Sequence, residues 1–338
     1  MSAPALPTPA SGPALIEVVR PGLLSSVQDL GRPGHRALGV PLGGAADTFS
    51  LRAANALVGN PEHAAALECT LLGPQLLLHC DTVLALCGGR FQVQANGLEL
   101  PLWRPLRLAA GSLLNIGRAE RGARLYVAFA GGLKLPSLLG SVSAQIGSGW
   151  PGLCGRALVK GDQLTLRRPS ELGTDWPQLG DGVRMARWWA NPVPILELEQ
   201  PAEVTLLPGR DSATDLDLLH DTAWRVSSRS SRMGLRLEGP TLNLLEPVLT
   251  ISEPVVPGTL QLPPEGGPIV LLNDAQTVGG YPRIGHVARA DLPRLAQLAP
   301  GETLRFLPGS QEAAVDRLRQ LERHLQKLRL AAQQATGG

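Results

Sequence analysis

The sequence predicts a mainly β protein made of antiparallel barrels or sandwiches. From Leu76 onward, short apolar or alternating runs recur, separated by glycine or proline. The chain holds 39 glycines and 30 prolines, enough to end many short strands. Strands of this length and spacing are typical of barrels and sandwiches. A unit of glycine, polar residue and strand begins at Gly111, Gly161 and Gly301, which suggests related barrel closures in two domains.

Length and composition indicate the domain organisation. With 338 residues, 43% of them apolar, the chain can bury a large core and is expected to form about two domains. Residues 1–14 are rich in proline, alanine and serine and are expected to be a disordered tail. We expect one β-barrel domain over residues 15–195, a second over residues 196–308, and a helix over residues 309–334.

The stretch from residue 169 to residue 194 is expected to connect the two domains, because proline, glycine and aspartate leave few strand patterns in it. Tryptophans in and just before it are expected to cover barrel ends: Trp150, Trp176, Trp188 and Trp189.

Charge and cysteine content exclude several functions. The net charge is +2 with acidic and basic residues interspersed, so no basic stripe for nucleic acid is present. No apolar stretch is long enough to span a bilayer and no signal peptide is recognisable, so we expect a cytoplasmic protein without a membrane partner. No metal site is expected, because the histidines are isolated and the cysteines lack C-x-x-C spacing.

The chain opens with a short strand and a glycine-rich loop. Residues 16–19 alternate as a strand, and the next apolar run leads to the polar Gln28 and Asp29. Residues 31–44 hold five glycines, but no Gly-Lys-Ser/Thr occurs in the sequence, so a nucleotide-binding phosphate loop is excluded. The loop can still offer backbone N–H groups to an anion.

Asp47 is placed to cap a helix. One apolar face follows it, and Gly59 ends the helix. A second short helix is predicted from Asn60, with Pro61 at its first position. Glu68 lies where that helix gives way to an apolar strand. A carboxylate among apolar neighbours is either salt-bridged or functional, and the sequence leaves both alternatives open.

Two segments of the second half are candidate binding sites. Residues 225–232 are rich in arginine and serine, which fits a solvated edge strand or anion recognition, and anion recognition is favoured for Arg232. Gln261 lies on a predicted strand. The buried strand at residues 269–272 leads into a polar cluster, which is either a turn that satisfies its own backbone or, as favoured here, a site. This cluster contains Asn273, Asp274, Gln276, Thr277 and Tyr281.

Ser310 caps a final helix with one apolar stripe. Most such stripes dock on their own domain. Because this helix is terminal, binding to a partner stays open as an alternative.

No self-sufficient catalytic signature is present, since the sequence lacks a Gly-x-Ser-x-Gly elbow, a His-Glu-x-x-His motif and a metal-ligand cluster. The prominent polar residues are amides, carboxylates and guanidinium groups. Together they suit a small substrate that carries an amide and a carboxylate. We expect these distant segments to converge on a cavity between the two barrels.

Three motifs resemble those of a known family. Residues 26–32 (SVQDLGR), 231–239 (SRMGLRLEG) and 273–283 (NDAQTVGGYPR) are similar to the motifs of the C subunit of 5-oxoprolinase. That family includes the carboxyltransferase halves of urea carboxylase, the allophanate hydrolase subunit 2-like proteins and the kinase-inhibitor antagonists of sporulation. The chain departs from the pattern of these relatives at Ala46, Val142, Ala144 and Val278, the last three standing in place of polar residues.

The resemblance implies a fold of two cyclophilin-like β-barrel domains and an enzyme component that is inactive alone. In this family the C subunit acts with the A and B subunits to hydrolyse 5-oxo-L-proline to L-glutamate. ATP is consumed by the complex, and its site is not assignable to this chain. The chain has no biotinyl-lysine segment.

The resemblance also implies roles for the candidate residues. Asp274 or Glu68 would position or activate water, and Arg232 or Arg32 would bind carboxylate or phosphate. The ring amide would be oriented by Gln28, Asn273, Gln276 and Tyr281, with further substrate contacts from Asp29, Gln261 and Thr277.

Two other functions stay open. One is the carboxyltransferase component of a biotin-dependent, urea-type carboxylase, which needs a biotinylated carrier from another chain. The other is a non-catalytic regulator that binds a kinase-inhibitor-like protein similar to the B subunit of 5-oxoprolinase.

Overall fold

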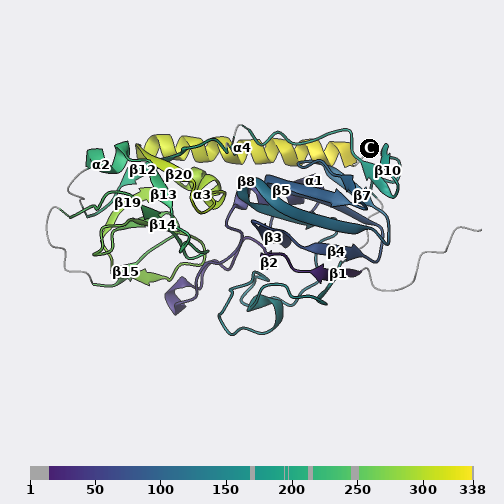
Figure 1. Cartoon of the computed structure of the whole chain (residues 1–338), viewed down its shortest axis with the longest axis horizontal. Helices are drawn as coiled ribbons and strands as arrows, with labels where there is room; N and C mark the ends of the chain where they lie inside the picture. Colours follow the sequence, from purple (N-terminus) through teal and green to yellow (C-terminus); the bar gives the residue numbers. More distant parts are fainter. Residues whose placement is uncertain are drawn as a thin grey trace, which may run out of the picture.

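The computed structural model describes residues 15–167, 172–193, 195–196, 198–211, 216–244 and 251–336. Two β units lie side by side, and the long helix α4 (Gln311–Thr336) runs along both of them (Figure 1). In the described part of the chain, no helix is long and apolar enough to cross a membrane.

The first unit is a curled antiparallel sheet. Its main strand order in the described residues is β10-β11-β7-β5-β8-β4-β1-β9, with β2 joined through β3 to β8, and β6 paired with β5. The strands are β1 (Leu15–Arg20), β2 (Leu24–Gln28), β3 (Ala66–Thr70), β4 (Gln75–Leu78), β5 (Thr82–Ala95), β6 (Leu98–Glu99), β7 (Pro105–Leu108), β8 (Leu113–Phe129), β9 (Gln163–Thr165), β10 (Gln178–Gly180) and β11 (Val183–Met185).

The first part of β5 (residues 82–89) and the end of β8 (residues 122–129) are buried on both faces, which explains their apolar sequences. Leu84 and Leu86 point into the core of the sheet, whereas Val83 and Ala85 pack beneath the helices. The pairing register shifts after Gly88, which has φ of 131°. A Cβ there would collide with the Arg124 carbonyl, so only glycine fits.

The second unit is a closed barrel in the order β12-β19-β16-β17-β14-β13-β20, and the parallel pair of β12 and β20 closes it. Trp224 and Phe306 fill its core with no exposed surface. A two-stranded ribbon of β15 and β18 lies beside it. The strands are β12 (Ala202–Pro208), β13 (Trp224–Val226), β14 (Gly234–Glu238), β15 (Glu253–Pro254), β16 (Thr259–Gln261), β17 (Ile269–Leu271), β18 (Val278–Gly279), β19 (Arg283–Val287) and β20 (Thr303–Pro308).

Helices join the two units. α1 (Thr48–Leu57) is capped by Asp47, whose side chain accepts from the Ser50 N–H at 2.9 Å. α4 packs on α1 through Leu321 and Leu325 and reaches the second unit through the Arg317–Asp291 ion pair. The terminal helix therefore docks within its own chain. The other helices are η1 (Arg36–Leu38), η2 (Gly152–Cys154), α2 (Leu216–Asp221), η3 (Arg289–Asp291) and α3 (Leu292–Ala296).

The predicted fold class is confirmed: the protein is mainly β, with one closed barrel, one curled sheet and a C-terminal helix. Two local predictions are wrong. Residues 60–65 form a turn instead of a second helix. The stretch expected to be only a connection contributes β10 and β11, because β11 pairs with β7 at the sheet edge.

The packing of α4 leads to a stability prediction. Leu325 is 1% exposed, so Leu325→Ala should lower the free energy of unfolding by about 2–5 kcal/mol through lost burial and a residual cavity. Leu330→Ala is the matched control on the same helix, because that side chain is 49% exposed. Denaturant unfolding measures both variants, and equal effects would contradict the docking of α4.

Candidate site at the domain interface

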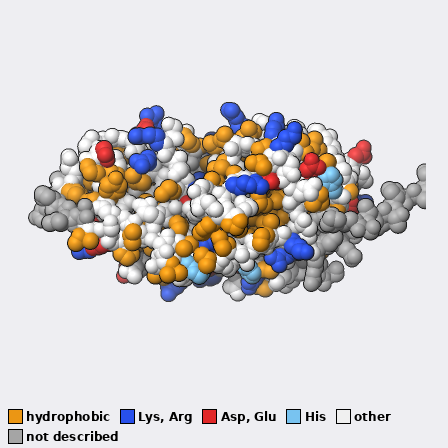
Figure 2. Space-filling view, turned by 90° about the horizontal axis from the view of Figure 1, so that it is seen from below, with side chains coloured by type: hydrophobic (Ala, Val, Ile, Leu, Met, Phe, Trp, Pro, Cys, Tyr) orange, Lys and Arg blue, Asp and Glu red, His pale blue; other side chains and the backbone are white. Residues whose placement is uncertain are grey.

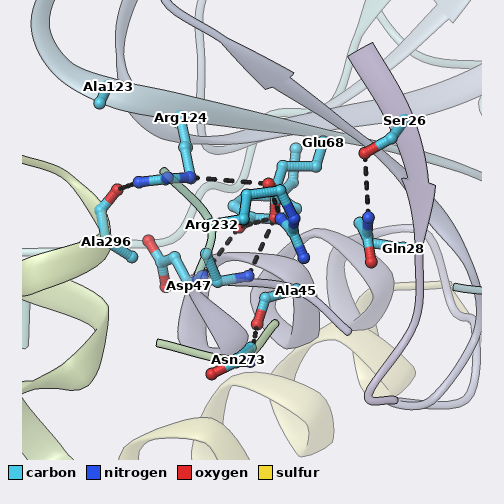
Figure 3. A network of polar contacts seen from close by, with 12 residues as sticks. Ser26, Gln28, Ala45, Asp47, Glu68, Ala123, Arg124, Arg232, Asn273 and Ala296 are labelled. Carbon is cyan, nitrogen blue, oxygen red and sulfur yellow. Dashed lines mark hydrogen bonds and ion pairs between the residues drawn. The ribbon is translucent and has the colours of Figure 1, made fainter. Parts of the chain in front are cut away.

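A buried polar network joins the two units (Figure 3). The first unit supplies β3, β8 and the loop at residues 31–47, and the second supplies the loop before β14 and the segment after β17. In Figure 1 the purple segment that carries η1 extends from the first unit to the β15–β18 ribbon of the second unit. Arg36 on it donates to the Val255 carbonyl.

Arg232 is the centre of this network. Its Nε and Nη2 donate to the two Asp274 carboxylate oxygens at 2.8 and 3.1 Å. Nη2 also donates to the Gly44 carbonyl at 2.6 Å, and Nη1 donates to Glu68. The side chain is only 7% exposed. One guanidinium therefore binds carboxylates from both units.

Glu68 is 1% exposed and fully occupied. Its Oε2 accepts from the Ala46 N–H at 2.9 Å and the Tyr126 hydroxyl at 2.7 Å, and its Oε1 lies 3.6 Å from Arg124 Nε. Burial raises the pKa of Glu68, but Arg232 and Arg124, together with the hydrogen bonds from Ala46 and Tyr126, hold the pKa below its ordinary value. Of the two alternatives that the sequence left open, the salt bridge is the one observed.

Sequence reasoning missed the residues that extend the network. Tyr126 on β8 links Glu68 to the Asp47 N–H at 2.8 Å. Gln297 donates to Asp47 at 2.8 Å and accepts from the N–H groups of Ala123 and Arg124 at 3.1 and 3.0 Å. Burial raises the pKa of Asp47 in spite of its hydrogen bonds to Ser50 and Gln297. No local sequence pattern marks a tyrosine within a strand or a glutamine after α3 as part of this network.

Asn273 and Asp29 fasten the glycine-rich loop from its two sides. Asn273 donates to the Ala45 carbonyl at 2.6 Å, and its own carbonyl accepts from Gly43 at 2.9 Å. The Asp29 carbonyl accepts from Ala45 at 2.9 Å, while its carboxylate binds Ser141, Ser143 and the Val142 N–H. The distant segments therefore meet at the interface through hydrogen bonds, whereas their convergence on a cavity stays a prediction.

Three departures from the relatives' pattern act through the backbone. Ala46 and Val142 use their N–H groups to bind Glu68 and Asp29, and Ala144 offers its carbonyl to Gln28 at 3.2 Å. These contacts do not depend on the side chain that was exchanged.

Arg32 and Gln28 are buried beside this loop. Arg32 Nη2 donates to the Ser143 carbonyl at 2.6 Å, and the guanidinium lies 4.5 Å from the centre of the Trp150 ring. Burial lowers the pKa of Arg32, and Asp29 opposes that shift. Gln28 donates to Ser26 Oγ at 2.9 Å. Trp150 thus covers a cation instead of a barrel end.

The remaining predicted residues lie on the second unit, outside the Arg232 contacts described above. Gln261 is buried and donates to the Tyr281 carbonyl at 3.4 Å. Thr277 is 8% exposed, Gln276 is half-buried, and the Tyr281 side chain is 47% exposed.

A cleft of about 120 Å³ opens onto the network from the side of β3. Thr70, Arg124, Ser231 and Arg232 line it, so it could admit a small anion or water. A larger hollow of about 180 Å³ lies far away, beside β7 and β11, and does not touch the network. Within the described ranges, no group of side chains has the composition of a metal site. On the face in Figure 2, basic side chains are scattered and form no stripe.

The network predicts an unequal response to loss of surface and buried ion pairs. Arg232→Met should lower the free energy of unfolding by about 3–5 kcal/mol, because Asp274 would stay buried without its cation and Glu68 would keep only Arg124. Arg225→Met removes the exposed pair with Glu238 and should leave unfolding nearly unchanged. Denaturant titration at neutral pH compares the two variants. A small loss for Arg232→Met would show that the units associate without this contact.

Comparison with known proteins places the chain in a family. Residues 38–308 match the model described as carboxyltransferase domain, subdomain A and B. The chain is 35% identical over 326 residues to the C subunit of 5-oxoprolinase from Escherichia coli (strain K12), covering 93% of this chain and 97% of that one. It is 31% identical over 319 residues to the Haemophilus influenzae protein of the same name, covering 93% and 98%.

A solved structure agrees with this assignment. The K. lactis urea amidolyase superposes with a TM-score of 0.84 at 28% identity, over 94% of this chain and 20% of that one. Because the family model spans most of the chain and the relatives align along nearly their whole length, this protein belongs to the carboxyltransferase-domain family that contains the C subunit of 5-oxoprolinase, as its three motifs predicted.

Proposed function

We propose that this chain is the C subunit of an ATP-dependent 5-oxoprolinase, which hydrolyses 5-oxo-L-proline to L-glutamate together with proteins similar to the A and B subunits. The observation that carries the proposal is the 35% identity to the Escherichia coli protein along 97% of its length. The chain spans only 20% of the K. lactis urea amidolyase.

The chemistry of a cyclic amide requires activation. An amide carbonyl is a poor electrophile, and transfer of a phosphoryl group from ATP to its oxygen, with release of ADP, would make the carbon open to attack by water. The ring C–N bond would then break to free the amine, and a second water would hydrolyse the resulting acyl phosphate to the carboxylate and phosphate. No Gly-Lys-Ser/Thr cradle is present in the sequence, so we assign the use of ATP to the complex and no ATP site to this chain.

The contacts of the candidate residues support a division of roles. Arg232 and Arg124 together neutralise Glu68 and Asp274, so we assign Arg232, Glu68 and Asp274 first to holding the two units in register. A role for Glu68 or Asp274 in positioning water would require that Arg232 be displaced. Arg32 and Gln28 keep polar atoms without partners and are the better candidates for contact with substrate.

The second candidate is the carboxyltransferase component of a urea-type carboxylase. The superposition on the K. lactis urea amidolyase favours it. The sequence offers no biotinyl-lysine segment, so a carrier chain would have to deliver the carboxyl group.

Reconstitution distinguishes the two functions. The chain is mixed with proteins similar to the A and B subunits from the same cell, and glutamate and ADP are measured with 5-oxo-L-proline as substrate. We expect both products from the complete mixture, and only background when this chain or ATP is omitted. Carboxylation of urea from carboxybiotin, without release of glutamate, would support the second candidate. An assembled mixture that performs neither reaction would overturn the proposal.

A further inference from the structure

A cluster of unpaired polar atoms lies beside the interface network. Among the described residues, Gln28 Oε1, Arg32 Nε, Arg32 Nη1 and Gln145 Oε1 are buried without a hydrogen-bond partner. Arg32 and Gln28 have no exposed surface. An unpaired buried polar group destabilises the fold, and more so when it is charged. Because native proteins keep few such groups, a cluster of them at one place requires an explanation, and a bound water, ion or ligand would supply one.

These side chains are held against one short segment. Arg32 donates to the Ser143 carbonyl and Gln28 to the Ala144 carbonyl, and Gln145 follows directly in the chain. The position that a Cβ would take on Gly43 lies 3.0 Å from Arg32 Nη1 and 3.6 Å from Gln145 Oε1. Gly43 has φ of 64° and no side chain, so its backbone lies directly against both of these groups.

The free atoms define the chemistry of the ligand. Gln28 directs its NH₂ at the Ala144 carbonyl, which can only accept, so the free end of this amide is its oxygen. Gln145 adds a second free amide oxygen. Both oxygens require a donor, whereas the free N–H groups of Arg32 require an acceptor, best a negatively charged one. The complement is a small carboxylate with a neighbouring N–H.

Trp150 covers this cluster. Its ring lies over the Arg32 guanidinium, and it belongs to an exposed loop at residues 146–152. Gly147, Gly149 and Gly152 of that loop have positive φ, and a Cβ on any of them would meet no atom within 4 Å. The base of the loop is held by hydrogen bonds from the Gln145 N–H to the Cys154 carbonyl at 2.7 Å and from the Gly147 N–H to the Gly155 carbonyl at 3.1 Å, so any opening would be confined to its exposed tip.

We propose that Arg32, Gln28 and Gln145 form a subsite for a small carboxylate with an adjacent N–H, and that Trp150 is its lid. The identity of the ligand rests on the proposed function: 5-oxo-L-proline carries its carboxylate on the carbon bonded to the ring N–H. Gln145 and Trp150 thereby become specificity-determining residues that the three family motifs do not include.

Equilibrium binding tests the subsite without turnover. Calorimetry and tryptophan fluorescence are recorded with the full chain and with the reconstituted complex in the absence of ATP. The probes are 5-oxo-L-proline, cyclopentanecarboxylate, which keeps the carboxylate but lacks the N–H, and urea, which has N–H groups but no charge. We expect 5-oxo-L-proline to bind best and cyclopentanecarboxylate to bind about tenfold more weakly, the effect of one lost hydrogen bond to a buried group.

Variants at Gln145 and Trp150 test the subsite without replacing the buried Arg32. Gln145→Glu should place a carboxylate beside Arg32, raise the melting temperature and abolish binding of 5-oxo-L-proline. Gln145→Ala should keep the melting temperature and weaken binding about tenfold. Trp150→Phe should remove the ligand-dependent fluorescence change, whereas Trp189→Phe, at a side chain 58% exposed, should retain it.

The outcomes separate this inference from the proposed function. Undiminished binding to the Gln145→Glu variant, equal binding of urea, or no binding to the complex would overturn the subsite. Binding that depends on Gln145, in a complex that releases no glutamate, would retain the subsite and remove the proposed function. Normal turnover by a complex that contains the Gln145→Glu variant would retain the proposed function and overturn the subsite.

Discussion

The Arg232 guanidinium holds a carboxylate from each β unit, Glu68 from the first and Asp274 from the second. Removing three charges from water is costly, and their attraction compensates only if every donor is satisfied. Here Nε, Nη1 and Nη2 all have partners, including the Gly44 carbonyl. Such an arrangement tolerates little displacement of one unit against the other. Its main effect is therefore to fix their relative position.

The same contact organises the elements around it. Glu68 also accepts from Ala46 and Tyr126, and Tyr126 in turn accepts from the Asp47 N–H at the start of α1. α1 carries α4, which returns to the second unit. A continuous series of hydrogen bonds and packed side chains thus links the Arg232 guanidinium to α4, the helix that spans both units.

The fold could be predicted from the sequence wherever the signal is local. Strand runs, the Asp47 cap and the stripe of the terminal helix are patterns within single segments, and the structure contains all three. Partners across the interface leave no such pattern. Tyr281 stood out because its segment is polar, yet it is half exposed, while the buried Tyr126 was hidden in an apolar strand. β10 and β11 were missed because their pairing depends on β7, many residues away.

The loop at residues 43–45 lies between the hydrogen-bonded Arg232 network and the unpaired polar atoms of Arg32 and Gln145. On one side its carbonyls accept from Arg232 and Asn273. On the other side Gly43 borders the unpaired atoms of Arg32 and Gln145. Gly43, Gly44 and Ala45 are each hydrogen-bonded to the second unit. A shift of the second unit would therefore move Gly43 relative to Arg32. The ion pairs of Arg232 therefore fix the position of Gly43, which borders the proposed subsite.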